Sequence, residues 1–342
     1  MSLRAALRQQ AKNNQSLGSP FTAHVLGLLA DRLQPGTALN DRLFGWQGDI
    51  GSSAASVPLR LLGGLHALVL NGSAPELRAL YPPNPQPSDA ALWQAIDAAM
   101  QDNAAFLDDW LNNAPQTNEV RRAAILIATG HWLARKNGLP IALSELGASG
   151  GLNLMWDTFG MRVGGQTYGP DSPAFTLTPD WNGPLPPVNT PMISDRRGVD
   201  LNPLDPTNPD DALRLTAYLW ADQPERLERT KAVINTYAAQ VDKGDAAAWL
   251  AARLKAQRPG QTHLIYHTIA WQYFPDATKT ACEAALSDAG ARATKDAPLA
   301  RLSMEADGGK GAALTLWLWP EGRKVNLGRV DFHGRWVDWR AE

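Results

Sequence analysis

The first 135 residues carry apolar positions at helical spacing, and no run among them alternates like a strand. Segment 56–70 (SVPLRLLGGLHALVL) has a proline in its opening turn and apolar residues all round, which predicts a buried helix. Segment 81–88 (YPPNPQPS) holds four prolines and predicts an extended connector. Further helices are predicted at 90–100, 104–111 and 119–136. The pattern therefore predicts an all-helical N-terminal domain over residues 1–115.

From residue 140 onward the pattern changes to short apolar runs separated by helical segments, which is typical of a mostly parallel sheet. The clearest predicted strand is 263–268, and the C-terminal tail alternates strand-like runs with glycine turns. A stretch rich in proline and glycine, 160–209, interrupts this order and predicts an insertion at about 160–198 with a hairpin in MRVGGQTYG. Helices are predicted at 210–220, 224–240, 245–257 and 277–291.

Residues 140–155, PIALSELGASGGLNLM, carry more information about function than any other stretch. An apolar run ends in Glu145, a glycine-rich turn extends to Gly151, and residues 152–155 have the pattern of the first turn of a helix. Strand, glycine turn and helix hold nucleotides in α/β domains, because glycines allow a close approach and helix N–H groups point at the ligand. The stretch therefore indicates a nucleotide-like ligand.

The acid two positions before the first glycine resembles the first motif of class I S-adenosylmethionine-dependent methyltransferases, acid-x-Gly-x-Gly-x-Gly. Here the motif is Glu145-x-Gly147-x-Ser149-x-Gly151, with Ser149 in place of the middle glycine. The resemblance implies S-adenosylmethionine as the cofactor. It also implies the fold class of residues 116–342: an α/β, Rossmann-like class I methyltransferase sheet, mostly parallel, with seven strands and an antiparallel C-terminal hairpin.

A cofactor bound at the glycine turn also needs polar groups at the carboxyl ends of the next strands. Three residues lie at or near the ends of predicted strands, in the expected order along the chain. Asp200 ends the run RRGVD, where a carboxylate can accept both ribose hydroxyls; its alternative role is to shape the Asn-Pro turn that follows. Asp245 is placed for an adenine amino group, or it is only a helix N-cap. His267 ends the strand 263–268 and faces the reacting methyl group, or it is a core histidine.

The predicted site combines these residues with others near the glycine motif. Cofactor-binding residues are expected to be Glu145, Gly147, Ala148, Ser149, Gly151, Asn153, Asp200 and Asp245. His267 and Glu119 are expected to be catalytic, as acceptors of a proton from the methyl acceptor. Substrate contacts are expected from Asn118, Trp156 and Trp271. For Asn118 and Glu119 the alternative is helix capping, and no metal site is expected.

Composition narrows the class of ligand. The chain has 342 residues, of which 44% are hydrophobic and 19% charged, so it can bury a sizeable core. A net charge of −2 argues against a general nucleic-acid binder and favours a small-molecule or peptide-sized substrate. The single cysteine, Cys282, excludes an internal disulfide, and no apolar stretch is long enough for a signal peptide or a membrane span. We therefore expect a soluble cytoplasmic protein; its oligomeric state is not indicated.

Four strings together resemble a bacterial family that is grouped with the methyltransferase-like nucleotide folds and catalogued as a domain of unknown function. The strings are QTNEVRR, ELGASGGLNLMWD, RRGVDLNPLDPTNPDDALRLTAYLWADQPERLERT and IYHTIAWQYFP. The resemblance covers nearly the whole chain. It implies a helical N-terminal part on a methyltransferase-like domain, and it does not supply an activity.

Three other functions compete with that of a methyltransferase. The fold can serve a protein that binds a ligand and performs no chemistry. The motif also reads as G-x-S-x-G, the nucleophile elbow of α/β hydrolases, with Ser149 as nucleophile, Asp200 or Asp245 as acid, and His267 or His333 as base. A hydrolase elbow follows several earlier strands, and none is predicted before residue 140. A nicotinamide-dependent oxidoreductase is disfavoured because the spacing is not G-x-G-x-x-G.

Overall fold

The computed structural model describes residues 1–52 and 54–341, and its contacts divide the chain into two compact units. Unit 1 comprises residues 1–117 and 206–231, and unit 2 comprises residues 118–205 and 232–342. The sequence-based division at residue 116 placed 206–231 in the second domain. In the structure this segment belongs instead with the N-terminal helices.

Unit 1 is helical, and none of its described residues lies in a strand. Its helices are α1 Leu3–Ser16, α2 Pro20–Arg32, α3 Ala38–Phe44, α4 Val57–Leu70, α5 Pro75–Arg78, α6 Asp89–Asp102, α7 Ala104–Trp110, α9 Pro209–Ala217 and α10 Pro224–Asn235, of which the last residues belong to unit 2. The predicted buried helix is α4, with a proline at its start and buried residues on all sides. The predicted all-helical character of the N-terminal region is therefore confirmed.

Close packing on α4 explains why residues 206–231 join unit 1. A Cβ at Gly63 would lie 2.5 Å from the ring of Tyr218, directly after α9, and a Cβ at Gly64 would lie 2.7 Å from Leu107. Glycines on α4 thus let other helices approach closely. The position of α9 could not be derived from the pattern, because about 150 residues separate the two partners in sequence.

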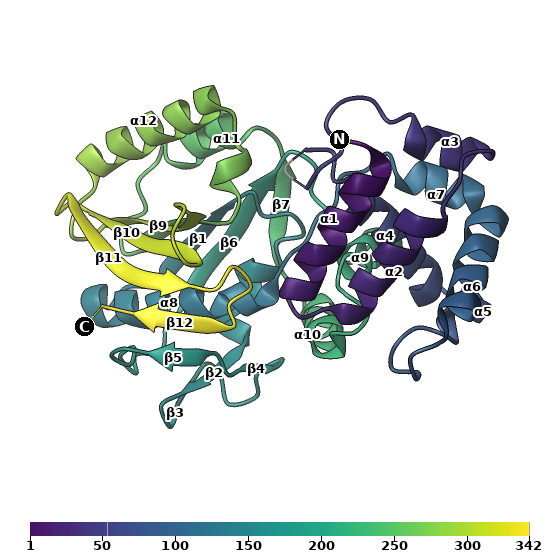
Figure 1. Cartoon of the computed structure of the whole chain (residues 1–342). Coiled ribbons are helices and arrows are strands. Elements are labelled where there is room, and N and C mark those ends of the chain that lie inside the picture. Colours follow the sequence, from purple (N-terminus) through teal and green to yellow (C-terminus); the bar gives the residue numbers. More distant parts are fainter. Residues whose placement is uncertain (53, 342) are drawn as a thin grey trace. The chain divides into compact units, whose positions relative to one another are not determined.

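Unit 2 is built on one large sheet (Figure 1). The order of its strands is β5-β12-β11-β10-β9-β8-β1-β6-β7. Strands β7, β6, β1, β8 and β9 are parallel neighbours, and β9 to β12 form an antiparallel meander. Strand β5 adds to the edge, parallel to β12. The strands are β1 Ile141–Leu146, β5 Asp180–Asn182, β6 Ile193–Asp200, β7 Gln240–Lys243, β8 Thr262–Thr268, β9 Leu299–Ala306, β10 Ala312–Trp319, β11 Arg323–Val330 and β12 Trp336–Trp339.

The sheet departs from the predicted one in its size and its C-terminal end. It has nine strands among the described residues rather than seven, and a meander takes the place of a single C-terminal hairpin. The additional strands β5 and β12 have three and four residues, too few for a reliable alternating pattern. The coarser prediction, an α/β unit with a mostly parallel sheet and antiparallel C-terminal strands, is confirmed.

The predicted insertion supplies a small second sheet. Its hairpin is confirmed as β2 Gly160–Val163 and β3 Gln166–Tyr168, and β4 Thr176–Leu177 pairs with β2. The insertion ends earlier than predicted, because β6 already begins at Ile193. Its strand β5 pairs with β12, so the insertion also extends the main sheet.

Helices cover both faces of the parallel strands (Figure 1). Helix α8 Ala123–Asn137 packs on one face, and α11 Ala246–Arg253 with α12 Asp276–Arg292 packs on the other. The faces alternate along each strand: Leu264 belongs to the core under α8, and Ile265 to the core under α11. Three short 3-10 helices are η1 Val120–Arg122, η2 Leu152–Thr158 and η3 Trp271–Tyr273. The predicted helix after the glycine motif is thus the 3-10 helix η2.

Candidate functional site

The glycine turn, residues 147–151, joins β1 to η2 and has left-handed backbone at three positions. Gly147, Ser149 and Gly151 have φ values of 69°, 54° and 69°. A Cβ at Gly147 would lie 2.6 Å from the Cβ of Ala270, and a Cβ at Gly151 would lie 2.6 Å from Cγ2 of Val241. Glycine is therefore required at both positions for conformation and for packing. Ser149 adopts the same conformation with a side chain, which costs about 1–2 kcal/mol.

The N–H groups of the glycine turn point at acceptors of the protein itself. Those of Gly147 and Ala148 donate to the carbonyl oxygen of Val199 at 2.9 and 3.1 Å. The N–H of Ser149 donates to Oδ2 of Asp200 at 2.8 Å. Phosphate-binding turns direct such N–H groups at the ligand. These three N–H groups are therefore not directed at a ligand phosphate.

Asp200 ties the end of β6 to the glycine turn. Besides the bond from Ser149, its Oδ1 accepts the N–H of Asn202 at 2.9 Å. The predicted turn-shaping role is therefore present. Each carboxylate oxygen still has a second lone pair that can accept a hydroxyl hydrogen from a ligand, so the predicted contact with ribose stays a prediction.

A second strained turn follows β8 and contacts the glycine turn. Ile269 has a φ of 52°, an outlier for a β-branched residue. The next residue, Ala270, is the neighbour that a Cβ in the glycine turn would meet. Glu305 holds this second turn, because its Oε1 accepts the N–H groups of Ala270 and Trp271, both at 3.1 Å. Among the described residues of unit 2, Ser149 and Ile269 are the two non-glycine residues with positive φ, and such strain concentrates at functional sites.

The carboxyl of Glu145 lies in the interior beside Tyr266 and Asn153. The hydroxyl of Tyr266 is 3.3 Å from Oε2 of Glu145 and 3.2 Å from the carbonyl oxygen of Asn153. Burial raises the pKa of Glu145 to about 8; the hydrogen bond from Tyr266 and the charge of Arg122 oppose this shift only in part. At neutral pH the carboxyl is therefore mostly protonated.

Two buried polar atoms in the segment after β1, one in the glycine turn and one in η2, have no partner among the described residues. The Oγ of Ser149 and the Oδ1 of Asn153 make no hydrogen bond with the residues that the structure describes, although both side chains are at least nine-tenths buried. Such an atom costs roughly 1–3 kcal/mol, and most buried polar groups in native proteins are paired. A ligand is one explanation for such atoms. We refer to Glu145, Ser149, Asn153 and Tyr266 as the turn cluster.

Asn118 and Glu119 meet the turn cluster through the segment that precedes α8. The Oδ1 of Asn118 accepts the N–H of Leu152 at 2.8 Å, and the carbonyl oxygen of Glu119 accepts from Nδ2 of Asn153 at 3.3 Å. The buried side chain of Glu119 accepts the N–H of Arg121 at 3.1 Å. Asn118 therefore caps η2 rather than the helix that it precedes. The structure brings both residues to the turn, and their roles toward a ligand stay predictions.

His267 lies on the opposite face of the sheet from Glu145. Tyr266 stands directly beside Glu145 in the register of β1 and β8, and successive residues of a strand face opposite ways. His267 Nδ1 is 2.7 Å from Oε1 of Glu305, and its Nε2 accepts from Nε of Arg301 at 3.3 Å. The ring is fully buried, and burial lowers its pKa against the opposing effect of Glu305. Because both nitrogens are engaged, the geometry does not match the prediction that His267 faces the reacting methyl group.

The remaining predicted residues have structural partners. Asp245 is the N-cap of α11, where its Oδ1 accepts two backbone N–H groups at 2.9 and 3.2 Å. Trp156 is buried in the core under α8, and its Nε1 has no hydrogen-bond partner among the described residues. Trp271 stacks on the ring of His267 with centroids 4.8 Å apart. The capping role that was the alternative for Asp245 is therefore present, and the roles predicted for these three residues toward a ligand stay predictions.

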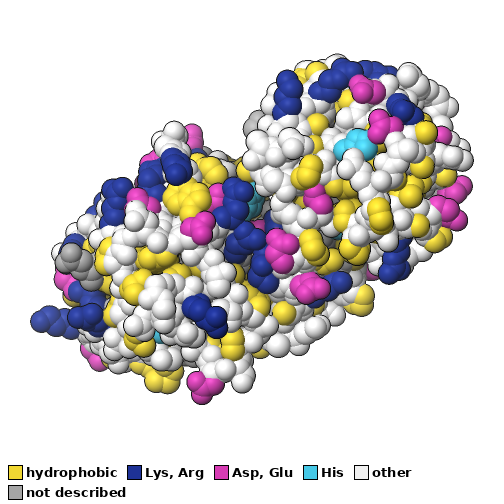
Figure 2. Space-filling view, turned by 60° about the horizontal axis from the view of Figure 1, so that its bottom comes forward, with side chains coloured by type: hydrophobic (Ala, Val, Ile, Leu, Met, Phe, Trp, Pro, Cys, Tyr) yellow, Lys and Arg dark blue, Asp and Glu magenta, His cyan; other side chains and the backbone are white. Residues whose placement is uncertain are grey.

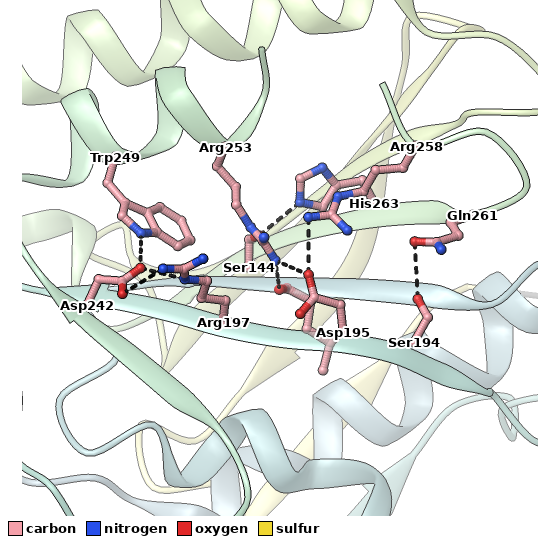
Figure 3. Close-up of polar contacts among 11 residues, drawn as sticks. Ser144, Ser194, Asp195, Arg197, Asp242, Trp249, Arg253, Arg258, Gln261 and His263 are labelled. Carbon is pink, nitrogen blue, oxygen red and sulfur yellow. Dashed lines mark hydrogen bonds and ion pairs between the residues drawn. The ribbon is translucent and has the colours of Figure 1, made fainter. Parts of the chain in front are cut away.

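A second polar cluster, which sequence reasoning missed, lies between the sheet and α11 (Figure 3). We call it the α11 network; its side chains are Ser144, Asp195, Arg197, Asp242, Trp249, Arg253, Arg258 and His263. Its centre is Ser144, whose Oγ lies 2.8 Å from Nε2 of His263 and 3.0 Å from Nε of Arg253. Burial lowers the pKa of His263 to about 3. The neutral ring therefore accepts the Ser144 hydrogen, since Arg253 only donates.

The serine–histidine pair of the α11 network does not support the hydrolase interpretation. Ser144 is fully buried within a central strand, so a substrate has no access to it. The nucleophile of that interpretation was Ser149, whose Oγ has no hydrogen-bond partner among the described residues. A serine hydrolase needs a histidine at that atom. The sequence offered no signal for the α11 network, because its members are spread over more than a hundred residues.

The described surface adds little to the choice of ligand. In Figure 2, positive and negative side chains are interspersed with hydrophobic ones over the face that is drawn. No described helix has the length and apolar character that a membrane span requires. The described residues also include no group of three or more His, Cys, Asp or Glu that could hold a metal ion.

Comparison with known proteins assigns the chain to a family. No curated protein and no solved structure matches it. A family model does match residues 4–339, which covers both units. The chain therefore belongs to the bacterial family described as "Uncharacterized protein conserved in bacteria (DUF2332)".

Proposed function

We propose that the protein binds S-adenosylmethionine at the glycine turn and transfers its methyl group to a small or peptide-sized acceptor. The observation that supports this proposal is the turn cluster: a buried carboxyl that is mostly protonated at neutral pH, followed along the chain by two buried polar atoms without a partner among the described residues. The cluster lies at the carboxyl end of β1, beside Asp200 at the end of β6. Open α/β sheets bind their ligands at this end of the strands.

The residues present fit such a cofactor. Asp200 has lone pairs left for ribose hydroxyls, and the unpartnered atoms of Ser149 and Asn153 would accept or donate hydrogen bonds to the ligand. The buried carboxyl of Glu145 would gain a cationic neighbour and lose its proton. No phosphate is needed, which agrees with N–H groups of the turn that are bonded internally.

When bound, S-adenosylmethionine supplies a methyl group that is already activated by its sulfonium. The protein then has to orient the acceptor and exclude water. Of the two predicted bases, His267 has both ring nitrogens in hydrogen bonds, one with Glu305 and one with Arg301. Glu119 is held next to Asn153 and stays our candidate for taking the acceptor's proton.

A non-catalytic ligand-binding protein is the second candidate. The hydrogen bonds of His267 favour this candidate, because they occupy both ring nitrogens of one of the two expected proton acceptors. Under this alternative the turn cluster binds the same ligand and no methyl group is transferred.

Calorimetric titration with S-adenosylmethionine tests the proposal. We expect micromolar binding that is weakened at least about tenfold in the Glu145→Gln variant, since an amide cannot take up the positive charge of the ligand. At about pH 7 the intact protein should release a proton on binding, because its Glu145 begins protonated. Titrations in two buffers with different ionisation enthalpies detect that proton.

Glu321→Gln is the matched control, because Glu321 is half exposed and pairs with Lys136. Binding and proton release should both survive in this variant. Absence of any binding of S-adenosylmethionine to the intact protein would overturn the proposal. Binding without formation of S-adenosylhomocysteine, across a screen of acceptors, would favour the non-catalytic alternative.

A further inference from the structure

A pocket of about 320 Å³ lies at the edge of the unit 2 sheet, where β5 and β12 meet the turn between β9 and β10. It is within the size range of small-molecule sites, roughly 300–1,000 Å³. Its lining includes Asp180, Asn182, Lys310, Arg329, Trp336 and Asp338, together with two apolar neighbours of β5 and β12. Strand β12 is five positions from β1 in the sheet. At about 4.8 Å per strand this is roughly 24 Å, so the pocket is separate from the glycine turn.

The walls of the pocket are fixed by bonds within the protein. Arg329 makes two hydrogen bonds to Asp307, at 2.9 and 2.6 Å, and donates to the carbonyl oxygen of Lys310 at 2.7 Å. Nδ2 of Asn182 donates to Oδ1 of Asp338 at 3.0 Å, across the junction of β5 and β12. These contacts join the insertion, the β9–β10 turn and the last strand into one preformed wall.

Several groups in the pocket are left open for a ligand. The exposed carboxylate of Asp180 has no hydrogen bond or ion pair with any residue that the structure describes. The Oδ1 of Asn182 is a further acceptor beside it. The Nζ of Lys310 lies 4.8 Å from the ring centre of Trp336 and is the matching donor. The pocket thus presents acceptors, a donor and a half-buried indole.

We propose that this pocket binds a saccharide ring. A sugar ring offers vicinal hydroxyls, which both donate and accept, and an apolar C–H face that packs on an aromatic ring. Asp180 and Asn182 are placed to accept from hydroxyls, Lys310 to donate to them, and the part of the Trp336 indole that Lys310 does not cover to receive the C–H face. The proposal is independent of the function proposed for the glycine turn.

The charges of the pocket argue against ionic ligands. Two carboxylates, Asp180 and Asp338, and two cations, Lys310 and Arg329, line the same space. A phosphate, a carboxylate or an amine would meet like charges as well as opposite ones, so the lining gives a ligand of either sign no net attraction. A neutral ligand rich in hydroxyl groups meets no like charge. The balanced lining therefore selects a neutral polyol over a charged metabolite.

Saturation-transfer-difference NMR on the full chain tests the proposal, with glucose, galactose, mannose and N-acetylglucosamine as separate probes. We expect saturable binding of at least one sugar, with transfer strongest to the protons of its apolar face. Asp180→Ala should raise the Kd at least about tenfold, the loss of one charge-assisted hydrogen bond. Trp336→Ala should abolish the signal.

Two matched controls exclude indirect effects. Asp171→Ala removes another exposed aspartate of the same insertion. Trp317→Ala removes a half-buried tryptophan of β10 that packs between Arg301 and Lys324, outside the pocket. Both variants should bind like the intact protein. The proposal is overturned if none of the four sugars binds at about 10 mM, if Asp180→Ala leaves the Kd unchanged, or if inorganic phosphate or glycine binds here in place of sugar.

Discussion

The turn cluster and the α11 network are both polar clusters on the parallel part of the unit 2 sheet, yet they differ in how the hydrogen bonds of their buried atoms are satisfied. In the α11 network each buried polar side-chain atom of the described residues has a partner within the protein. In the turn cluster the Oγ of Ser149 and the Oδ1 of Asn153 have none. The backbone differs as well, because left-handed non-glycine residues of unit 2 occur beside the turn cluster.

The difference separates a structural cluster from a candidate site. A saturated network gains stability from its own bonds and has nothing left to offer a ligand. An incomplete cluster is less favourable for the protein alone, and a ligand can complete it. By this criterion Ser144 and His263 are structural, even though their geometry resembles that of a catalytic pair.

The largest expected effect is that of an added methyl group in the glycine turn. Gly147→Ala should lower the free energy of unfolding by about 2–5 kcal/mol, from left-handed strain and from the contact with Ala270. Gly260→Ala is the control: its φ is 74°, and nothing lies within 4 Å of its Cβ position. Strain alone should cost it about 1–2 kcal/mol. Urea unfolding measures both, and equal losses would show that the turn is not tightly packed.

An effect of intermediate size on the free energy of unfolding is expected from the ionisation of Glu145 as the pH changes. Its carboxyl stays protonated in the folded protein up to its pKa of about 8 and ionises near 4.5 in the unfolded chain. The unfolded state therefore holds fewer protons between these values, and stability falls as pH rises, by up to about 1.4 kcal/mol per pH unit. Relative to Glu145→Gln, the intact protein should lose up to about 3 kcal/mol between about pH 5 and pH 7. A constant difference would mean that the carboxyl ionises normally.

The same measurement also distinguishes the two clusters, because the α11 network should make the free energy of unfolding depend on pH in the opposite direction. Burial lowers the pKa of His263 from 6.5 to about 3, so the unfolded state binds more protons below pH 6.5. This contribution to stability is therefore complete above about pH 6.5 and is lost as pH falls toward 3. A fall in pH should therefore reduce the stability contributed by the α11 network. A rise in pH should reduce the stability contributed by the turn cluster.

The smallest expected effects on the free energy of unfolding come from substituting one residue of each cluster. Arg253→Met should lower the free energy of unfolding by about 2 kcal/mol, because it leaves Asp195 and Ser144 without their shared donor. Ser149→Ala should raise it by roughly 1–3 kcal/mol, since the substitution removes a buried hydroxyl that has no partner among the described residues. Ligand titration should show the reverse, with binding weakened only by Ser149→Ala. A large loss of stability in Ser149→Ala would contradict the distinction between the clusters.

The local parts of the fold were predictable. The strand before the glycine motif, the insertion hairpin and the helical N-terminal region follow from patterns within about 15 residues, and the structure contains all three. Glycine at positions 147 and 151 was likewise indicated by the motif, and left-handed backbone requires it there. The approach of Asn118 and Glu119 to the turn was also anticipated, because they lie close to it along the chain.

The sequence by itself determined most of the strands and helices and the turns between them, because these choices depend on neighbours along the chain; the short strands β5 and β12 were among the exceptions. Only the tertiary structure decided which face each strand residue occupies, and this places Glu145 with Tyr266 while His267 faces α12 with Arg301 and Glu305. It also decided that residues 206–231 pack with the N-terminal helices. The physical reason is that alternation offers every strand two faces, and the choice between them is made by burial against segments distant in sequence.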